Sequence, residues 1–414
     1  MPVTPDSKPR LRPIQLFPVE DEGRRMVVMH DPVGMADGDV VMAEFAVFIL
    51  MRLDGEHSLG AIQAEFAEAA GQPIPFEHLE RLVDRLEEQR FLEGPRFETH
   101  VRGLTEAYRA APARQTQPDS GLGVELHRLP AALRHILEGA GSEAPPGRLV
   151  GLVAPHLDLQ RGRECYADAY GLLRQAAPIE RFVILGTNHF GRSSSAVATT
   201  KGFETPLGMA ETDVAFLDRL QVRCGTDLCR EELDHAREHS IEMQVLFLQY
   251  VRYRRPFRIV PILCPDPCGP TGTQPRDGKG VDLRRLAEAL ADEIREDPVT
   301  TCVIAGADLA HVGRQFGDEC DLDPPFLQQV ERQDREALRH LELGDPEAFR
   351  AFLAAEDNPT RICSAGSLYA LLTVLNRAYG DSRVSARLMR YHQAVDRSAQ
   401  TGVTCAAMAF TLKA

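Results

Sequence analysis

Four apolar segments in the second part of the chain have the pattern of strands that are buried on both faces of a sheet. Apolar residues in them are nearly continuous and do not alternate with polar ones, as is typical of parallel strands covered by helices. Each segment ends at turn-forming or polar residues. The four predicted strands are RLVGLVAPH (148–156), RFVILGTNH (181–189), FRIVPILC (257–264) and TTCVIAGADLAH (300–311).

Segments with the spacing of helices lie between these strands or follow them. They are IEMQVLFLQYVRY (241–253), DLRRLAEALADEIRE (282–296), PFLQQVERQDREALRHLE (325–342) and SAGSLYALLTVLNRAYG (364–380). Two later apolar segments, SRVSARLMRYHQ and TGVTCAAMAFTL, are predicted to close the sheet as strands. Strands that alternate with helices indicate an α/β fold, so we expect a mostly parallel sheet flanked by helices over residues 148–414.

The first part of the chain has a different pattern and predicts a small separate domain at residues 1–96. Within 44–94 the apolar spacing predicts three helices with turns at Asp54-Gly55 and Gly71–Pro75, and then a short strand in FLEG. This is the pattern of a winged-helix-like α+β domain. Residues 97–147 have the composition of a linker, with one predicted helix in VELHRLPAALRHILEGA that Pro130 interrupts early.

The charge of the chain argues against DNA binding, which is the function that a winged helix usually suggests. The chain of 414 residues has a net charge of −14, and residues 41–95 hold eleven acidic side chains against four arginines and no lysine. Such a surface repels phosphates, so we expect neither nucleic acid nor an anionic membrane as a partner. No segment is long and apolar enough to span a bilayer. Nine cysteines without an apolar leader segment favour reduced thiols and a cytoplasmic protein.

Histidines end three of the four predicted strands, at His156, His189 and His311. The carboxyl ends of parallel strands meet at one edge of a sheet, where open α/β folds bind their ligands. Three imidazoles at that edge are more simply explained by one shared site than by three independent structural roles. Asn188, beside His189, lies at the same edge and is a candidate substrate contact.

Imidazole is the most common metal ligand, and two histidines with one anionic ligand are the arrangement of non-haem Fe(II) oxygenases. The residues leave the third ligand open. His239 and Glu242 in EHSIEMQ lie on one helical face, and they can equally pair or cap a helix. Asp308 is a second candidate, or an outer residue that orients an imidazole. Cys363 precedes a predicted helix, whose N-terminus favours a thiolate, or is a small core residue.

Residues 148–414 resemble the Memo family, whose bacterial members carry the name AmmeMemoRadiSam system protein B. Eight segments occur in the order of that family: VAPHLDLQ, VILGTNHFG, TPLG, EHSIEMQVLFLQY, IVPIL, AGADLAHVG, RICSAGSLYALL and RYHQAVDRSAQTGVTCAAMAF. The resemblance implies a fold similar to that of class III extradiol dioxygenases. It also implies a metal site formed by His156, His189 and Cys363.

The resemblance further implies an acid/base role for His311, with Asp308 and His239 nearby. Fe(II) is the expected ion, and copper is the alternative because a thiolate ligand also suits that metal. The chain departs from the family pattern at Leu157-Asp158-Leu159, at Phe190 and after the cysteine at Ser364-Ala365-Gly366. The substrate therefore stays open, and the candidate substrate contacts are Asp158, Asn188 and Glu242.

The N-terminal pattern LDGEHSLGAIQAEF…LVDRLEEQRFLEG is similar to that of PqqD-like domains. The resemblance implies a module that binds a peptide by adding a strand to a sheet edge. It suggests a peptide substrate, or a partner enzyme of the radical-SAM type, brought to the metal site; a dimerisation or packing domain is the alternative. For the whole chain we expect a redox or dioxygenase-type enzyme acting on a small molecule or a peptide. The alternative is a non-catalytic metal-binding or interaction scaffold.

Overall fold

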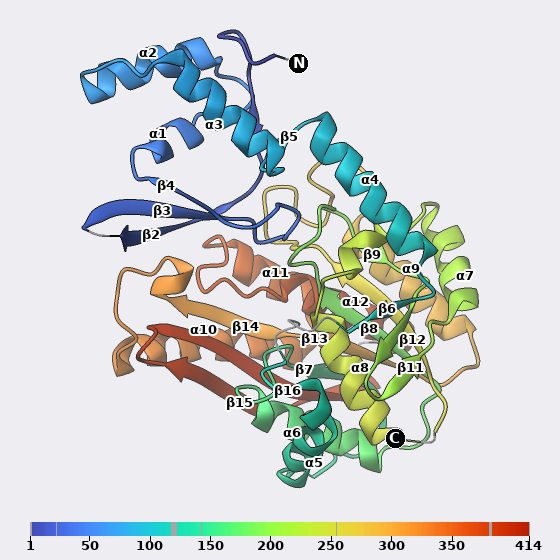
Figure 1. Ribbon diagram of the computed structural model, residues 1–414. Coiled ribbons are helices and arrows are strands. Elements are labelled where there is room, and N and C mark those ends of the chain that lie inside the picture. The colour runs from blue at the N-terminus through green and yellow to red at the C-terminus, as the bar shows by residue number, and fades with distance from the viewer. Residues whose placement is uncertain are drawn as a thin grey trace. The chain divides into compact units, whose positions relative to one another are not determined.

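The computed structural model describes residues 2–21, 23–116, 122–141, 143–253, 255–380 and 383–413. Internal contacts divide the chain into two compact units, Met1–Ala110 and Ala111–Ala414. Each unit has its own hydrophobic core, with one core in the first unit and two large ones in the second. Figure 1 shows the elements of both units.

The N-terminal unit is a small α+β domain. Strands β2 (Gln15–Asp21), β3 (Arg24–His30) and β4 (Val40–Ala43) form an antiparallel sheet, and β1 (Arg10–Leu11) pairs with β5 (Leu92–Glu93). The helices are α1 (Ala46–Leu50), α2 (Leu59–Ala70), α3 (Phe76–Glu88) and α4 (Pro95–Ala110). The three helices and the short strand predicted within 44–94 are confirmed.

Local signals explain where these helices begin and end. Ser58 caps α2 by accepting a hydrogen bond from the amide of Ala61, and Gly71 ends it in the left-handed conformation that glycine adopts without strain. Gly55 has a φ of 82°, as the turn before α2 requires. Helix α3 buries Leu79, Val83 and Leu86 at helical spacing.

The region expected to be a linker, 97–147, contains more structure than one helix. Helix α4 occupies its first part and belongs to the N-terminal unit, so the boundary between the units follows Ala110 and not residue 96. Strand β6 (Ala113–Gln115), a 3₁₀ turn at Leu126–Arg128 and helix α5 (Leu129–Glu138) follow. Pro130 lies in the first turn of α5 and does not interrupt it. Part of the linker-like sequence, 117–121, and residue 142 lie outside the described residues.

The C-terminal unit is built on a sheet of eight described strands in the order β14-β16-β7-β13-β8-β12-β9, with β15 paired to β16. The four central strands are parallel, and the strands on either side of them are antiparallel. The expected α/β fold is confirmed. The strand bounds are β7 (Arg148–Ala154), β8 (Arg181–Thr187), β9 (Val197–Ala198), β12 (Arg258–Cys264), β13 (Thr301–Gly306), β14 (Asp308–Gly313), β15 (Val384–Asp396) and β16 (Thr401–Leu412).

Helices cover both faces of this sheet (Figure 1). Side chains of β8 alternate between the two cores: Phe182 and Ile184 pack into one, and Val183 and Leu185 into the other. The helices are α6 (Arg163–Gln175), α7 (Val214–Cys224), α8 (Ser240–Val251), α9 (Leu283–Glu296), α10 (Pro324–Leu343), α11 (Pro346–Ala354) and α12 (Ala365–Tyr379), with 3₁₀ turns at Glu232–His235 and Arg314–Phe316. A smaller sheet joins β6 to β10 (Gly202–Thr205) and β11 (Gly208–Ala210).

One predicted strand is wrong in its extent. Residues 300–311 form two strands, β13 and β14, which separate at Ala307, where the backbone amide donates to the carbonyl of Ala154 at 2.7 Å. Strand β13 is parallel to β7 and β8, whereas β14 is antiparallel to β16. His311 therefore lies within an antiparallel strand and not at the carboxyl end of a parallel one.

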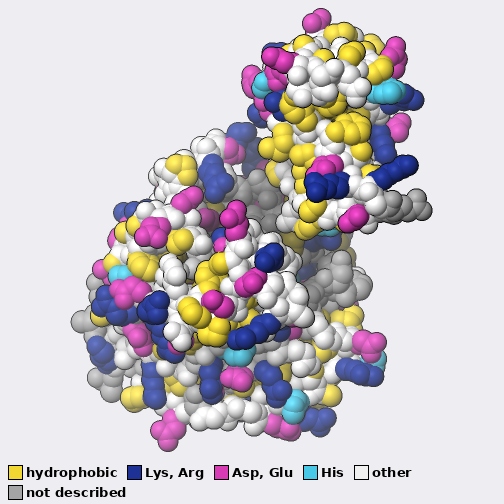
Figure 2. Space-filling view, turned by 90° about the vertical axis from the view of Figure 1, so that its left-hand side faces the viewer, with side chains coloured by type: hydrophobic (Ala, Val, Ile, Leu, Met, Phe, Trp, Pro, Cys, Tyr) yellow, Lys and Arg dark blue, Asp and Glu magenta, His cyan; other side chains and the backbone are white. Residues whose placement is uncertain are grey.

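Charges of both signs are interspersed on the face of the C-terminal unit seen in Figure 2, with no extended basic region. Hydrophobic side chains are exposed on the N-terminal unit in the same view. Among the described residues, none of the helices combines the length and apolar character needed to cross a bilayer. Exposed large hydrophobic residues of the first unit are Phe17, Val19, Val41, Phe45, Met51 and Leu104.

Candidate metal centre

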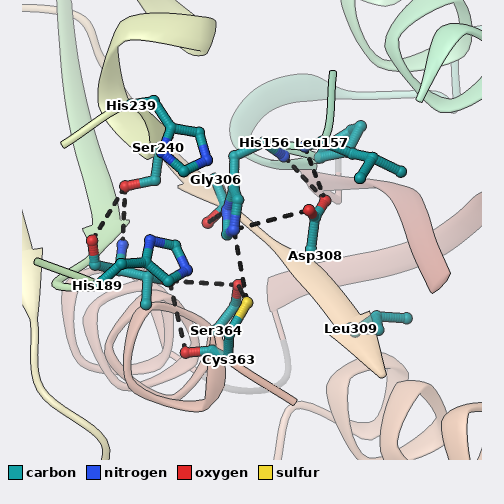
Figure 3. A network of polar contacts seen from close by, with 12 residues as sticks. His156, Leu157, His189, His239, Ser240, Gly306, Asp308, Leu309, Cys363 and Ser364 are labelled. Atoms are coloured by element: carbon teal, nitrogen blue, oxygen red, sulfur yellow. Dashed lines mark hydrogen bonds and ion pairs between the residues drawn. The ribbon is translucent and has the colours of Figure 1, made fainter. Parts of the chain in front are cut away.

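His156 and His189 each follow the end of a central strand by two residues, after β7 and β8. Strand β13 lies between these strands and ends at Gly306, so the two loops meet above its carboxyl end. The two imidazole rings are 4.9 Å apart between centroids. The sheet thus brings together two residues that are distant in the sequence, as the strand-end pattern predicted (Figure 3).

The buried ring of His156 is held through its Nδ1 atom. Nδ1 lies 3.0 Å from the carbonyl oxygen of Gly306, which can only accept, so Nδ1 carries the proton and donates. Nε2 is then the atom with a free lone pair. A carbonyl bonded to the nitrogen that does not bind the metal is one way in which proteins fix the tautomer and the direction of a metal-ligating histidine.

His189 is held in the same way by a carboxylate. Its Nδ1 lies 3.1 Å and 3.2 Å from the two carboxylate oxygens of Glu238, and its backbone amide donates to Glu238 at 2.8 Å. Burial would lower the pKa of His189, but the charge of Glu238 and the contact with Cys363 raise it well above its usual value. Nε2 of His189 is again the atom left for a ligand.

Glu238 is a functional residue that the sequence analysis missed. Its side chain is 1% exposed, and it also accepts hydrogen bonds from the backbone amides of His239 and Ser240, at 2.9 Å and 2.8 Å. Burial would raise its pKa, but the charge of His189 and these hydrogen bonds outweigh burial and hold the pKa well below its usual value. The sequence signal was its position in the EHS segment, directly before His239.

His239 directly precedes α8 and completes a group of three imidazoles. Ligand atoms of His156, His189 and His239 all lie within 4.8 Å of one another, the spacing that one metal ion requires. Burial lowers the pKa of His239 to about 3, with the charges of His156 and His189 acting in the same direction. Its ring is therefore neutral near pH 7 and able to bind a metal. The sequence pattern offered His239 among the candidates for the third ligand, and the family resemblance placed it near the acid/base histidine.

Cys363 lies beside the same group, two residues before the start of α12 and next to its N-cap residue, Ser364. Its Sγ is 3.5 Å from Nε2 of His156 and 3.5 Å from Oγ of Ser364. Burial would raise the pKa of this thiol, but His156 and His189 outweigh burial and lower it to about 6. The thiolate is thus the main form at pH 7. Among the described residues, the group whose ligand atoms all lie within 4.8 Å of one another contains the three imidazoles and not Cys363. The role of Cys363 as the third ligand therefore stays a prediction, supported by its contact with His156.

Asp308 holds the loop that carries His156. One carboxylate oxygen accepts from the backbone amides of His156 and Leu157, at 3.0 Å and 3.1 Å, and the other lies 3.7 Å from Nε2 of His156. Burial raises the pKa of Asp308 to about 6. This second oxygen lies beside Nε2, the nitrogen left for a ligand, whereas the ring is oriented at Nδ1 by Gly306. Asp308 therefore stays a candidate ligand in addition to holding the His156 loop.

His311 lies on β14, and its Nδ1 donates to the carbonyl of Leu309 at 3.0 Å, which leaves Nε2 free to exchange a proton. Burial lowers its pKa, against the charge of Asp308, which raises it. The backbone amide of His311 donates to Thr360 at 2.8 Å, and Arg361 donates to its carbonyl at 2.9 Å. These bonds join β14 to the loop that leads to Cys363.

The three expected substrate contacts are all engaged within the chain. Asp158 accepts from the amides of Gln160 and Arg161, both at 3.0 Å, and forms a local turn. Asn188 donates to Asp234 at 2.9 Å. These contacts indicate structural roles, and the substrate roles expected for both residues stay predictions.

Glu242, the third expected substrate contact, is fully buried in α8 and forms an ion pair with Arg114 of β6. The expectation that it contacts a substrate does not fit this position, because 0% of its side chain is exposed. His239 and Glu242 do not share one environment: His239 precedes α8 and is partly exposed at the site, whereas Glu242 lies within α8 and is buried against Arg114.

Two glycines permit α8 to begin so close to the sheet. A Cβ at Gly186 would lie 2.5 Å from Oγ of Ser240, and a Cβ at Gly306 would lie 2.7 Å from the carbonyl oxygen of Ser240. In the space so left, Oγ of Ser240 accepts from the amide of Thr187 at 3.0 Å and donates to its carbonyl at 3.1 Å. The end of β8 and the start of α8 are therefore fixed to each other, and with them His189 and His239.

The site opens toward solvent on one side. His156 is 2% exposed, whereas the side chains of His189 and His239 are 23% and 24% exposed. An ion held by these nitrogens and the Cys363 sulfur would have a mixed imidazole and thiolate environment, which suits iron, copper or zinc better than magnesium or calcium. The residues present therefore fit a transition-metal ion.

Comparison with known proteins agrees with this architecture. The family model described as "Memo-like protein" matches residues 125–409. The chain is 28% identical over 378 residues to a MEMO1 family protein of Aquifex aeolicus, covering 89% of this chain and 91% of the relative. It is 30% identical over 329 residues to a MEMO1 family protein of Thermus thermophilus, covering 78% and 91%. On both grounds, the chain belongs to the Memo family.

Proposed function

We propose that the C-terminal unit is a non-haem metal enzyme of redox or dioxygenase type that acts on a small molecule or a peptide. One observation carries the proposal: three imidazoles converge within 4.8 Å, and the thiol of Cys363 lies 3.5 Å from one of them. Nδ1 of His156 is held by the carbonyl of Gly306, and Nδ1 of His189 is held by the carboxylate of Glu238. A purely structural cluster of histidines would not need this arrangement.

In this proposal His156, His189 and Cys363 hold the metal, and His239 is an additional or alternative ligand. Fe(II) is the proposed ion and copper the alternative, since both accept imidazole and thiolate ligands. When bound, such an ion supplies a redox-active centre with open coordination positions. The partial exposure of His189 and His239 supports substrate entry from their side.

The protein groups have separate roles in this scheme. His311 takes up and returns a proton at Nε2, because Nδ1 is committed to the carbonyl of Leu309. Its lowered pKa keeps the ring neutral near pH 7, so Nε2 has a lone pair that can accept a proton. Asp308 keeps the His156 loop in place and adds negative charge near the imidazoles of His156 and His311.

We propose that the N-terminal unit brings a peptide, or a partner enzyme of the radical-SAM type, to the metal site. Its three-stranded sheet has two edge strands, β2 and β4, that can accept an added strand. Exposed apolar side chains at Phe17 and Val41 could contact the added peptide. All nine cysteines are free thiols, which supports the reducing cytoplasm as the location.

Metal analysis of the purified chain tests the centre. The wild type is expected to contain iron or copper at about one ion per chain, and H156A, H189A and C363A to contain much less. C224A, which removes a buried thiol elsewhere, is the matched control and should keep the metal. Wild-type protein that takes up no iron or copper, or a C363A variant that keeps its full content and affinity, would contradict the proposed ligand set.

Oxygen uptake separates an enzyme from the alternative, a metal-binding scaffold without turnover. The Fe(II)-loaded chain is incubated with catechols and with peptides encoded by neighbouring genes, and H311A serves as the variant that keeps the metal. Substrate-dependent uptake that falls in H311A supports the enzyme. Tight metal binding without uptake supports the scaffold. Isothermal titration with the same peptides tests the N-terminal unit, and no binding to any of them would contradict its proposed role.

A further inference from the structure

Arg114 is a fully buried arginine in β6, the first strand of the C-terminal unit. Its side chain is 1% exposed and forms an ion pair with Glu242 of α8. Nη2 donates to the carbonyl of Glu238 at 2.8 Å, and Nε donates to the carbonyl of His235 at 3.3 Å. One guanidinium thus contacts three points along the segment 235–242, which leads from a 3₁₀ turn into α8.

This segment also carries the groups that face the candidate metal. On one side, the backbone of Glu238 is held by Arg114. On the other side, the Glu238 carboxylate accepts hydrogen bonds from Nδ1 and the amide of His189. His239, the next residue, contributes its ring to the group of three imidazoles. Glu238 therefore links Arg114 to two of the three imidazoles, because it is hydrogen-bonded to His189 and directly precedes His239 in the chain.

Arg114 is itself held in a defined position. Strand β6 pairs in parallel with β10, with Arg114 opposite Phe203. The guanidinium carbon lies 5.2 Å from the centroid of the Phe203 ring, within the range of a cation–π contact. Both the backbone and the side chain of Arg114 are thus fixed by β10, and the guanidinium can act as a rigid support for segment 235–242.

Stability alone does not explain this pair. Removing an arginine and a glutamate from water is costly, and hydrophobic residues of similar size often stabilise a protein equally well or better. An arginine does offer a planar set of donors that can reach a carboxylate and two carbonyl oxygens at once. We infer that Arg114 is a positioning residue of the metal centre, which sets the metal affinity through Glu238 and the imidazole of His189. The inference rests on the proposed metal-binding function.

Cobalt(II) titration of the full chain tests this role, because Co²⁺ reports both affinity and ligand geometry in its absorption spectrum. The main variant is R114M/E242L, which removes the donors without leaving a buried charge unpaired. R114K keeps a positive charge beside Glu242 but, as a point donor, cannot reach all three acceptors. R181K is the matched control: Arg181 is equally buried and paired, with Asp213 and Asp297, at the opposite end of β8 from His189.

The expected result is a folded R114M/E242L protein whose Kd for Co²⁺ is at least tenfold higher than that of the wild type, with shifted ligand-field bands. R114K should show a smaller rise of about threefold and should decide the question if the double variant does not fold. R181K should bind as the wild type does. Circular dichroism and thermal unfolding of each variant show whether the protein is folded.

Two results would overturn the inference alone. One is wild-type cobalt affinity and spectrum in the Arg114 variants. The other is an equal loss of affinity in R181K, which would point to general destabilisation. If the wild-type chain binds neither cobalt nor iron, the proposed function fails as well. The two failures are therefore distinguishable from the wild-type titration.

Discussion

Glu238 shows how much of the proposed metal centre depends on one side chain outside the group of three imidazoles. It lies behind His189, is buried, and accepts hydrogen bonds from the ring and the amide of His189 and from the amides of His239 and Ser240. A carboxylate in this position fixes the tautomer of the imidazole and raises its basicity as a ligand. A description of the site therefore has to include Glu238 together with His189, the imidazole that it orients.

Replacing Glu238 by glutamine should weaken metal binding by about 10- to 100-fold. The amide keeps the size of the side chain but loses the charge and can accept fewer of the hydrogen bonds. Competition against a chelator of known affinity measures the change. E293Q is the control, since Glu293 is a buried carboxylate that pairs with Arg219 and Arg223 away from the site. Equal affinities of E238Q and the wild type would contradict the orienting role.

The variant C363S distinguishes two possible ligand sets. One consists of the three histidines, and the other contains Cys363 with His156 and His189. If Cys363 binds the ion, the Co²⁺ form of the wild type has an intense sulfur-to-cobalt charge-transfer band in the near ultraviolet, and C363S loses it along with much of its affinity. If the three histidines alone bind, the band is absent from both proteins. In that case H239A, and not C363S, should lose the metal.

Metal binding should release a proton near pH 7. The raised pKa of His189 means that its ring is protonated in the metal-free chain, whereas Cys363, with a pKa of about 6, is already a thiolate. A metal must displace the His189 proton, so the apparent affinity rises with pH until His189 is neutral. Below about pH 6 protonation of Cys363 should steepen the loss. Calorimetry in buffers of different ionisation enthalpy counts the protons, and no release at pH 7 would contradict this assignment.

At the scale of residues, the sequence was informative where a polar group interrupts an apolar strand. His156 and His189 stand out for that reason. Cys363 was one of several candidates for the third ligand, and the family resemblance selected it. Glu238 and Arg114 were not found, because their importance depends on contacts across 49 and 128 positions in the chain, to His189 and Glu242. A charged residue in a polar segment gives no sign that it is buried until the fold is known.

At the scale of elements, the break between β13 and β14 brings Asp308 and His311 into the site, because both residues lie on β14. The pairing of β14 with β16 is irregular between Asp308 and His311. There the amide of Ala310 donates to the side chain of Thr404 at 2.9 Å, and Thr404 donates to the buried carboxylate of Asp334 at 2.6 Å. Such irregularities redirect side chains beside active sites.

The substitution T404V should destabilise the protein by about 1–3 kcal/mol, because it leaves the amide of Ala310 without its acceptor and removes one of the two hydroxyl donors to Asp334, the other being Tyr391. Urea unfolding measures the loss. T404S keeps the hydroxyl and should recover most of the stability. We also expect T404V to lower any proton-transfer activity of His311 while leaving the metal content unchanged. Loss of metal in this variant would show that β14 supports the ligands themselves.

The apolar strands, the four helices between and after them and the two closing strands could be predicted, because burial leaves a clear pattern in the sequence. Helix α4 was missed because it lies in a segment interpreted as a linker and buries few apolar residues, although Phe97 and Val101 mark a buried face. The separation of β13 from β14 was not visible either. Both strands are apolar, and only the change of pairing partner at Ala307 distinguishes them.

At the scale of the whole molecule, two units with separate cores are joined through residues 110 and 111. The family match, residues 125–409, lies within the second unit. The match to the Aquifex aeolicus relative covers 89% of this chain and therefore extends into the N-terminal unit as well. The exposed apolar residues of this unit fit the binding role proposed for it. Its acidic character agrees with a peptide or protein partner better than with a nucleic acid.

Strand β6 lies outside residues 125–409, the range that the family model matches, so a protein shortened to that range loses Arg114. A fragment of residues 125–409 would lack the guanidinium that neutralises Glu242 and the three last residues of β16, of which Phe410 and Thr411 lie opposite Gly151 and Leu149. An unpaired buried charge alone costs about 3–5 kcal/mol. We expect this fragment to precipitate or to melt well below a fragment of residues 111–414, as differential scanning fluorimetry would show. Equal melting temperatures would mean that the shorter piece already contains everything the fold requires.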